Sequence, residues 1–172
     1  MRARAVLLVA ATTLAAAVAC SDNKSTTAPA PKSNLVTFKA TLNGASEVPA
    51  VASTGSGTFT ATLDTVTQDF IYDLTFTGLT SGVNNGHIHG PASPTATAGT
   101  TINFNTLSGA TFSFGQTSGT GRGIARLNTA YQITATINGD SLRKLLFAGL
   151  TYANIHTTQF PGGEIRGQIL KQ

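Results

Sequence analysis

The chain has 172 residues, of which 41% are hydrophobic and 10% are charged, and its formal net charge is +4 at pH 7. A charge this small, with no basic run and no basic–aromatic stripe, excludes a protein that binds nucleic acid through a strongly basic surface. A single cysteine excludes an internal disulfide, so the folded part must be stabilised by burial of apolar side chains.

Residues 1–19 have the three parts of a secretory signal peptide. Arg2 and Arg4 form a positive start, an apolar stretch follows, and small residues close it directly before Cys20. The apolar stretch is too short to span a membrane. Loss of the two arginines leaves nine basic against seven acidic residues, so the exported chain has a net charge of +2.

Cys20 gives this export signal a second interpretation. A cysteine directly after the small-residue site resembles the bacterial lipobox, in which the cysteine is lipidated and becomes the new N-terminus. Ordinary cleavage after Ala19, which would give a secreted or periplasmic protein, is the alternative. We favour the lipoprotein, because a lone thiol at the start of an exported chain otherwise has no role. Residues 20–34 are rich in Ser, Thr and Pro and predict a disordered tether.

Residues 35–172 predict one domain that consists mainly of β-strands. Apolar and polar residues alternate over 36–42, 59–63 and 70–76. Turn-forming residues separate such segments at intervals of about ten residues, which is typical of an antiparallel sandwich or barrel. Further short strands are expected at 100–105, 110–115, 123–127, 131–137, 151–156 and 164–170.

Three segments are expected to differ from this pattern. Residues 140–148 have a capping residue, good helix formers and a glycine stop, so they predict a short helix. The glycine-rich run 119–123 is not followed by a helix, as a phosphate-binding loop would be, and is interpreted as a hairpin turn. Residues 91–99 predict a long exposed loop.

All three histidines of the chain lie in two short motifs. His87 and His89 alternate in one motif, so their side chains point the same way if the segment is a strand. His156, in the second motif, is a candidate third ligand of a mononuclear metal site. The alternative is that these imidazoles bind backbone groups where two sheet ends meet. Tyr152 shares the strand face of His156 and is a candidate outer-shell group.

The chemistry of these side chains favours binding over catalysis. Imidazole suits copper and zinc, and we expect the three rings to coordinate one ion if their nitrogens converge within about 4 Å of one another. Glu47 and Glu164 both flank turns, and a carboxylate pair for acid–base catalysis is one interpretation. We favour a role in fixing loops together with Arg166. No residue is predicted to be catalytic, and the common hydrolase and redox signatures are absent.

Several motifs occur together in the order typical of the CHRD domain, which is named from chordin and is widespread in exported bacterial proteins. The resemblance covers essentially all of 35–172. It implies an immunoglobulin-like or superoxide-dismutase-like Greek-key β-sandwich. The motifs that carry it are Phe38-x-Ala40-x-Leu42, Glu47-Val48-Pro49, His87-Ile88-His89-Gly90-Pro91, Tyr152-x-Asn154-Ile155-His156 and Gly162-Gly163-Glu164-Ile165-Arg166-Gly167.

A fainter resemblance is to copper/zinc superoxide dismutase. The segment 78–82 followed by His87 and His89 is similar to the strand that leads to the first two copper ligands of that enzyme. The enzyme needs about six histidines and an aspartate for its two metals. Three histidines therefore exclude a two-metal dismutase site, but the similarity favours copper over zinc for a single ion.

Two functions are consistent with these features. The first is a lipoprotein of the bacterial cell envelope that binds one copper ion through His87, His89 and His156. The second is a non-catalytic module that binds an extracellular protein or glycan. The membrane, reached through the lipid on Cys20, is a further expected partner.

Overall fold

The computed structural model describes residues 34–107, 109–128 and 137–172, and this part of the chain is mostly antiparallel β-structure. The predicted fold class is therefore confirmed. The strands are β1 (Leu35–Asn43), β2 (Ser56–Asp64), β3 (Asp69–Thr77), β4 (Val83–His89), β5 (Thr100–Asn103), β6 (Thr111–Phe112), β7 (Gly119–Arg126), β8 (Tyr152–Thr157), β9 (Ile165–Gln168) and β10 (Leu170–Lys171). Two helical elements accompany them, η1 (Gly44–Ser46) and α1 (Gly139–Phe147).

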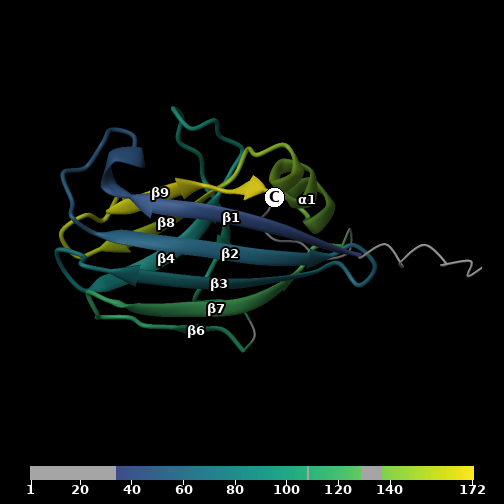
Figure 1. The fold of residues 1–172 in the computed structure, drawn as a ribbon, viewed down its shortest axis with the longest axis horizontal. Coiled ribbons are helices and arrows are strands. Elements are labelled where there is room, and N and C mark those ends of the chain that lie inside the picture. The colour runs from purple at the N-terminus through teal and green to yellow at the C-terminus, as the bar shows by residue number, and fades with distance from the viewer. Residues whose placement is uncertain (1–33, 108, 129–136) are drawn as a thin grey trace, which may run out of the picture. The chain divides into compact units, whose positions relative to one another are not determined.

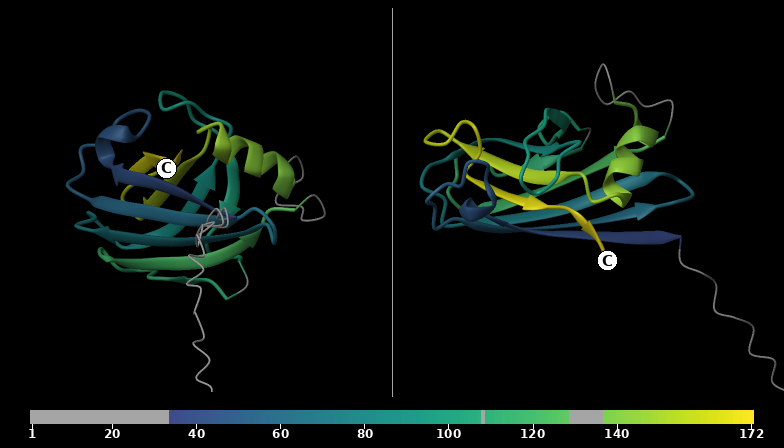
Figure 2. Two further views of the ribbon diagram at one scale, coloured as in Figure 1. Left: turned by 45° about the vertical axis from the view of Figure 1, so that its right-hand side comes forward. Right: turned by 90° about the horizontal axis from the view of Figure 1, so that it is seen from above.

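The two layers of the sandwich are parts of one curled sheet. Its strand order is β5-β4-β8-β9-β1-β2-β3-β7-β6, and β10 pairs with β1. The junction between the layers is narrow, because β1 and β9 share the single register pair Asn43 and Arg166. Figure 1 shows β1, β2, β3 and β7 in front of β4 and β8, and Figure 2 shows the curl from two further sides.

The core lies between these layers and is rich in aromatic rings. Phe59 and Tyr72 stack with their centroids 5.8 Å apart, and Phe104 lies 4.7 Å from Tyr72. Each of these rings is fully buried. Burial of one such side chain stabilises a fold by about 1.5–3 kcal/mol. The strict alternation of buried and exposed residues in β2 and β3 follows from this packing.

The glycines of 119–123 lie inside β7, so their interpretation as a hairpin turn is wrong. Gly121 and Gly123 face inward, where large rings leave no room for a side chain. A Cβ atom on Gly123 would lie 2.6 Å from the Tyr72 hydroxyl, and one on Gly121 would lie 2.5 Å from the Phe112 ring. The glycines are therefore required by the crowded core rather than by a turn.

The predicted helix at 140–148 is confirmed as α1. Its N-cap is Asn138, whose side-chain oxygen accepts a hydrogen bond from Ser141 N at 2.9 Å. Asp140 lies in the first turn and pairs with Arg143 and Lys144. Of the other expected elements, 110–115 is reduced to the two residues of β6, and most of 131–137 lies outside the described residues.

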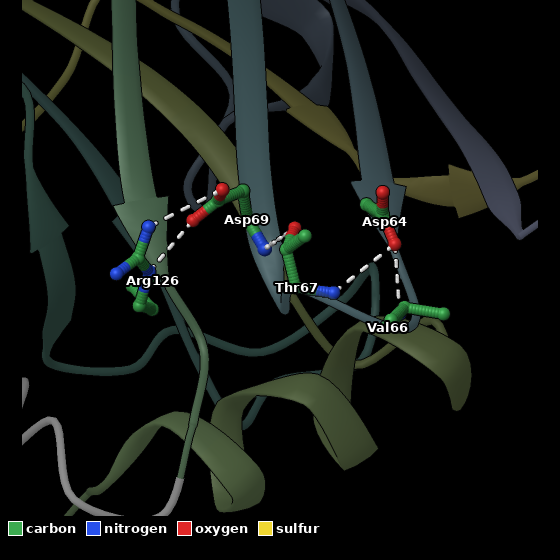
Figure 3. Close-up of polar contacts among 5 residues, drawn as sticks. All are labelled: Asp64, Val66, Thr67, Asp69 and Arg126. Atoms are coloured by element: carbon green, nitrogen blue, oxygen red, sulfur yellow. Dashed lines mark hydrogen bonds and ion pairs between the residues drawn. The ribbon is translucent and has the colours of Figure 1, made fainter.

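Short-range polar contacts fix the turn between β2 and β3 (Figure 3). The Asp64 carboxylate accepts hydrogen bonds from the backbone N–H groups of Val66 and Thr67, at 2.7 and 3.2 Å. Asp69, at the start of β3, pairs with Arg126 of β7 at 2.8 Å, in register across the two strands. Polar contacts within the β2–β3 turn and between β3 and β7 therefore fix this end of the sandwich, and none of them involves a histidine.

Strand β8 differs from the other strands because all six of its residues are buried. Its inward side chains, Ala153 and Ile155, join the hydrophobic core. Its outward face is polar and is covered by loops, including residues 91–99. No helix of the described residues is long and apolar enough to cross a membrane. The covered polar face of β4, β8 and β9 is the place where the candidate site lies.

Candidate metal site

The strand register brings the three histidines onto one face. In the antiparallel pair β4–β8, His89 lies opposite Tyr152 and His87 lies opposite Asn154. The next pair is Asn85 and His156, so His156 is the diagonal neighbour of His87. A register shift between Ile88 and His89, against β5, does not separate the two imidazoles, whose ring centroids are 5.2 Å apart.

The imidazole nitrogens converge. His87 Nδ1 lies 3.0 Å from His156 Nε2, and one ligand atom from each of the three rings lies within 4.8 Å of the others. This is the only such group of three or more His, Cys, Asp or Glu side chains found among the described residues. His87, His89 and His156 thus lie near one another, although their span of 4.8 Å is wider than the separation of about 4 Å expected from the sequence.

Backbone carbonyls fix two of the three rings. His89 Nδ1 lies 3.0 Å from the Ala98 carbonyl oxygen, and His156 Nδ1 lies 2.9 Å from that of Pro161. A carbonyl only accepts, so in each neutral ring Nδ1 carries the proton and Nε2 carries a lone pair, which in His156 accepts a hydrogen bond from His87 Nδ1. His89 Nε2 is buried and has no hydrogen-bond partner among the described residues. An unpartnered buried acceptor of this kind fits a metal ligand.

The rings are held in the neutral form that a metal requires. Burial lowers the pKa of His87 to about 4, and the neighbouring His156 and His89 contribute to the shift. Burial likewise lowers the pKa of His89 to about 4, against the opposing effect of the Ala98 hydrogen bond. The pKa of His156 is also lowered, again chiefly by burial. At neutral pH the three rings are therefore uncharged and do not repel a cation.

Binding an ion requires a small adjustment of the rings. Two nitrogens on opposite sides of one ion are about 4.2 Å apart, twice a metal–nitrogen bond of about 2.1 Å. The present span of 4.8 Å is wider, so at least one ring must move by several tenths of an ångström. A cavity of about 340 Å³ opens beside His87 and His156 and is lined also by Asn84, Asn85 and Pro161. This cavity borders two of the three imidazoles, whereas His89 does not line it.

The chain was compared with known proteins. A family model of the CHRD domain matches residues 38–169. The chain belongs to the CHRD family. No curated protein matches it, and neither does any solved structure. The match confirms the family expected from the sequence motifs and includes all three histidines, whereas Cys20 precedes the matched region.

Tyr152 has a supporting place in this CHRD domain. Its ring stacks on His89 with the centroids 4.8 Å apart and the planes 9° from parallel. Its hydroxyl lies 3.3 Å from the backbone nitrogen of Ala98 and 3.4 Å from the Ala98 oxygen. The hydroxyl thus contacts Ala98, the same residue whose carbonyl oxygen orients His89.

Arg166 secures the loop that covers the site. The guanidinium carbon of Arg166 lies 3.6 Å from the centre of the Tyr152 ring. Its Nη2 donates to the carbonyl oxygens of Ser93, Pro94 and Ala96, at 3.2, 3.5 and 2.9 Å. One buried cation therefore holds the loop that carries Ala98 and packs on the ring that supports His89. The sequence motif containing Arg166 gave no sign of these partners.

Glu164 joins segments that are distant in the chain. Its carboxylate accepts hydrogen bonds from Ser53 Oγ, from Thr157 Oγ1 and from both the N–H and the hydroxyl of Thr80, at 2.7 to 3.0 Å. Burial alone would raise the pKa of Glu164, but these hydrogen bonds outweigh it and hold the pKa below its usual value. Glu164 thus fixes loops, as expected, although its partners are three hydroxyl groups and one backbone N–H rather than Arg166.

Glu47 occupies a different environment. Burial raises its pKa to about 7, although the charge of Arg166 and the side chain of Asn154 lower it. The two glutamates thus differ in surroundings, in partners and in the direction of their pKa shifts. Glu47 and Arg166 instead face each other on the covered polar side of the sheet.

Proposed function

We propose that this CHRD domain binds a single copper ion through His87, His89 and His156. The observation that carries the proposal is the convergence of the three rings, two of which direct fixed Nε2 lone pairs into a buried site. Such a site holds an ion without a further charged ligand. The cavity beside His87 and His156 favours reversible binding of copper over a closed structural role.

Two of the three imidazoles are held in the tautomer that metal binding requires. The Ala98 and Pro161 carbonyls set the tautomers of His89 and His156. His87 Nδ1 now donates to His156 Nε2, so His87 must exchange this hydrogen bond for the ion. Transfer of the His87 proton from Nδ1 to Nε2 frees Nδ1 as a ligand and leaves the ring neutral.

Copper is preferred to zinc on chemical grounds. Neutral nitrogen sites bind divalent copper more tightly than divalent zinc, following the general order of first-row metals. No acidic side chain belongs to the group of potential ligands among the described residues, so the set consists of imidazoles alone. The fainter sequence resemblance to a copper enzyme supports the same choice.

We also propose that the domain is displayed on the bacterial cell envelope by a lipid on Cys20. The support is the sequence alone, in which a signal peptide ends directly before this cysteine. The protein is then expected in the membrane fraction of cells, and Cys20→Ala is expected to release it. Retention of Cys20→Ala in the membrane fraction would contradict lipid anchoring without affecting the metal proposal.

Metal analysis and copper titration of the purified protein test the copper site. One copper ion per chain is expected, with micromolar or tighter affinity. The variant His87→Ala/His89→Ala is expected to bind none. The variant Thr58→Ala/Thr60→Ala, at two exposed alternate positions of β2, is the matched control and should change the affinity less than about threefold. Absence of copper binding by the wild-type protein at micromolar copper concentrations would contradict the proposal.

A further inference from the structure

Exposed apolar side chains gather around the first half of β1. Seven large apolar side chains are exposed among residues 34–107, 109–128 and 137–172, and four of these lie near this part of the strand. The four, which we call the β1 patch, are between 40% and 69% exposed: Leu35, Val66, Phe147 and Leu170. Single exposed apolar residues are ordinary, whereas a group of them is typical of a surface that contacts a partner or a membrane.

The turn between β2 and β3 brings Val66 to the start of β1. The carbonyl oxygen of Asn34 accepts hydrogen bonds from the backbone N–H and the hydroxyl of Thr65, at 2.8 and 3.0 Å. Val66 follows directly, and Figure 3 shows its side chain pointing away from Asp69 and Arg126. Val66 is therefore fixed beside the residue at which the chain enters the sheet.

Helix α1 and strand β10 bring the other two side chains to the same strand. The Phe147 ring packs edge-on against Phe38 of β1, with the centroids 5.6 Å apart. Leu170 lies opposite Lys39 in the β1–β10 pair. A Cβ atom on Gly149 would lie 3.3 Å from Leu170 Cδ2, so the end of α1 also packs beside Leu170. Figure 1 shows α1 and the C-terminus beside this half of β1.

Two lysines border the β1 patch. Lys171 Nζ lies 5.4 Å from the centre of the Phe147 ring. Lys144, in the last turn of α1, is exposed, and the acidic Asp140 nearby is already paired with Arg143 as well as with Lys144. A lysine can lay its apolar stem along such a surface and extend its ammonium group toward lipid phosphates. The border therefore suits the anionic headgroups of a membrane.

The position of the β1 patch in the chain indicates which partner is nearest. Leu35 is the first residue of β1, so the segment that begins at Cys20 joins the domain at the patch. From Cys20 to Asn34 this segment spans at most about 50 Å even when fully extended. A lipid on Cys20 would hold the domain by this end and keep a bilayer within reach of the patch.

We propose that the β1 patch docks on the surface of the membrane that holds the lipid of Cys20. This inference rests on the lipid anchor of the proposed function and adds the orientation of the domain. A few apolar side chains alone bind a bilayer weakly and reversibly. A short tether strengthens such an interaction, because it sets an effective concentration on the order of 1 mM.

Docking by the β1 patch leaves the cavity beside the histidines uncovered. Strand β3 begins after the turn of Val66 and ends at Thr77, a length of about 30 Å. The loop of Pro161, which lines that cavity, is attached to the connection after β3, where Thr158 N donates to the Gly82 oxygen at 3.2 Å. The proposed copper site is therefore open at the end of the domain that lies away from the membrane.

Fluorescence of one introduced tryptophan tests the docking, because the chain contains no tryptophan. The chain from Cys20 onward, which includes every described residue, is coupled through its only thiol to a maleimide phospholipid. The vesicles consist of phosphatidylethanolamine and phosphatidylglycerol. Lipids brominated in their acyl chains should quench Val66→Trp at least about twofold more strongly than Phe114→Trp. Phe114→Trp is the matched control, because Phe114 is also exposed but lies beyond β6, outside the patch.

Leu170→Asn, added to Val66→Trp, provides a second comparison. Leu170 is half exposed, so this change removes apolar surface without opening the core, and it should reduce the quenching at least about twofold. Equal quenching of the two tryptophans would overturn the proposal, as would quenching that Leu170→Asn leaves unchanged. Dimers of the uncoupled chain that Leu170→Asn dissociates would show that a second copy covers the patch instead.

The docking proposal and the lipid proposal fail separately. Coupling through the thiol does not require that cells attach a lipid, so the quenching experiment reports only on the β1 patch. The membrane fractionation of Cys20→Ala reports only on the anchor. The copper titration depends on neither, because none of the three histidines belongs to the patch.

Discussion

At the scale of single residues, Glu164 makes the most concentrated set of polar contacts. Four hydrogen bonds converge on one carboxylate that is fully buried. Ser53, Thr80 and Thr157 come from three separate segments, so no local pattern in the sequence indicates this arrangement. The sequence did predict that this glutamate fixes a loop, because turns surround it, but the partners depend on tertiary structure.

Replacement of Glu164 by Gln is expected to lower the free energy of unfolding by about 2 kcal/mol at pH 7. The amide keeps the shape but loses the charge that strengthens the hydrogen bonds. Because the pKa of Glu164 is lowered on folding, its contribution is present above about pH 4.5 and is lost as the pH falls through the folded pKa. Urea denaturation of wild type and Glu164→Gln should therefore converge in acid. Asp73→Asn, an exposed control, should change stability by less than about 0.5 kcal/mol.

Glu47 is expected to have the opposite pH dependence. Its pKa rises on folding from 4.5 to about 7, so the folded state holds a proton that the unfolded chain releases. Its contribution to stability is therefore full below pH 4.5 and falls as the pH rises to about 7. Glu47→Gln should gain about 2 kcal/mol relative to wild type between pH 5 and pH 8.

The test of Glu47 requires the unfolding free energies of both wild type and Glu47→Gln. The three histidines have lowered pKa values and destabilise the fold as the pH falls below 6.5, in wild type and variant alike. The difference between the two unfolding free energies removes that shared effect. A difference that does not change between pH 5 and pH 8 would show that Glu47 is an ordinary exposed carboxylate.

At the scale of elements, the loop 91–99 and strand β9 act together. Arg166 holds the loop carbonyls, and the loop carries Ala98, whose oxygen orients His89. The exposure of this loop could be predicted from its composition. Its attachment could not, because Arg166 lies about seventy residues away in the chain and its contacts are with backbone oxygens.

Arg166→Lys is therefore expected to disturb a site that it does not touch. Lysine keeps the charge but lacks the planar group that packs on Tyr152 and holds the loop carbonyls. Copper affinity should fall about tenfold, a typical effect of an outer-shell substitution. Hydrogen exchange in residues 92–99 should become faster. Arg122→Lys, in the exposed pair with Asp73, is the control and should alter neither quantity. Wild-type copper affinity and wild-type hydrogen exchange in Arg166→Lys would contradict the positioning role of Arg166.

At the scale of the whole molecule, alternation of side chains accounts for most of what the sequence could predict. It placed β1, β2 and β3, and it put His87 and His89 on one face. It also predicted strands at 123–127 and 151–156, which lie in β7 and β8. It failed at 119–123, the first part of β7, where glycines serve a crowded core. The rings that require these glycines come from other segments, so a pattern confined to the strand itself cannot reveal them.

The proposed copper site is tested most directly by X-ray absorption spectroscopy of the copper-loaded protein. The account predicts three nitrogen ligands with the scattering pattern of imidazole, and the loss of one such ligand in His156→Ala. This follows from the convergence of His87, His89 and His156 on the covered face of β4 and β8. A first shell made of oxygen ligands, or one that is identical in wild type and His156→Ala, would contradict it.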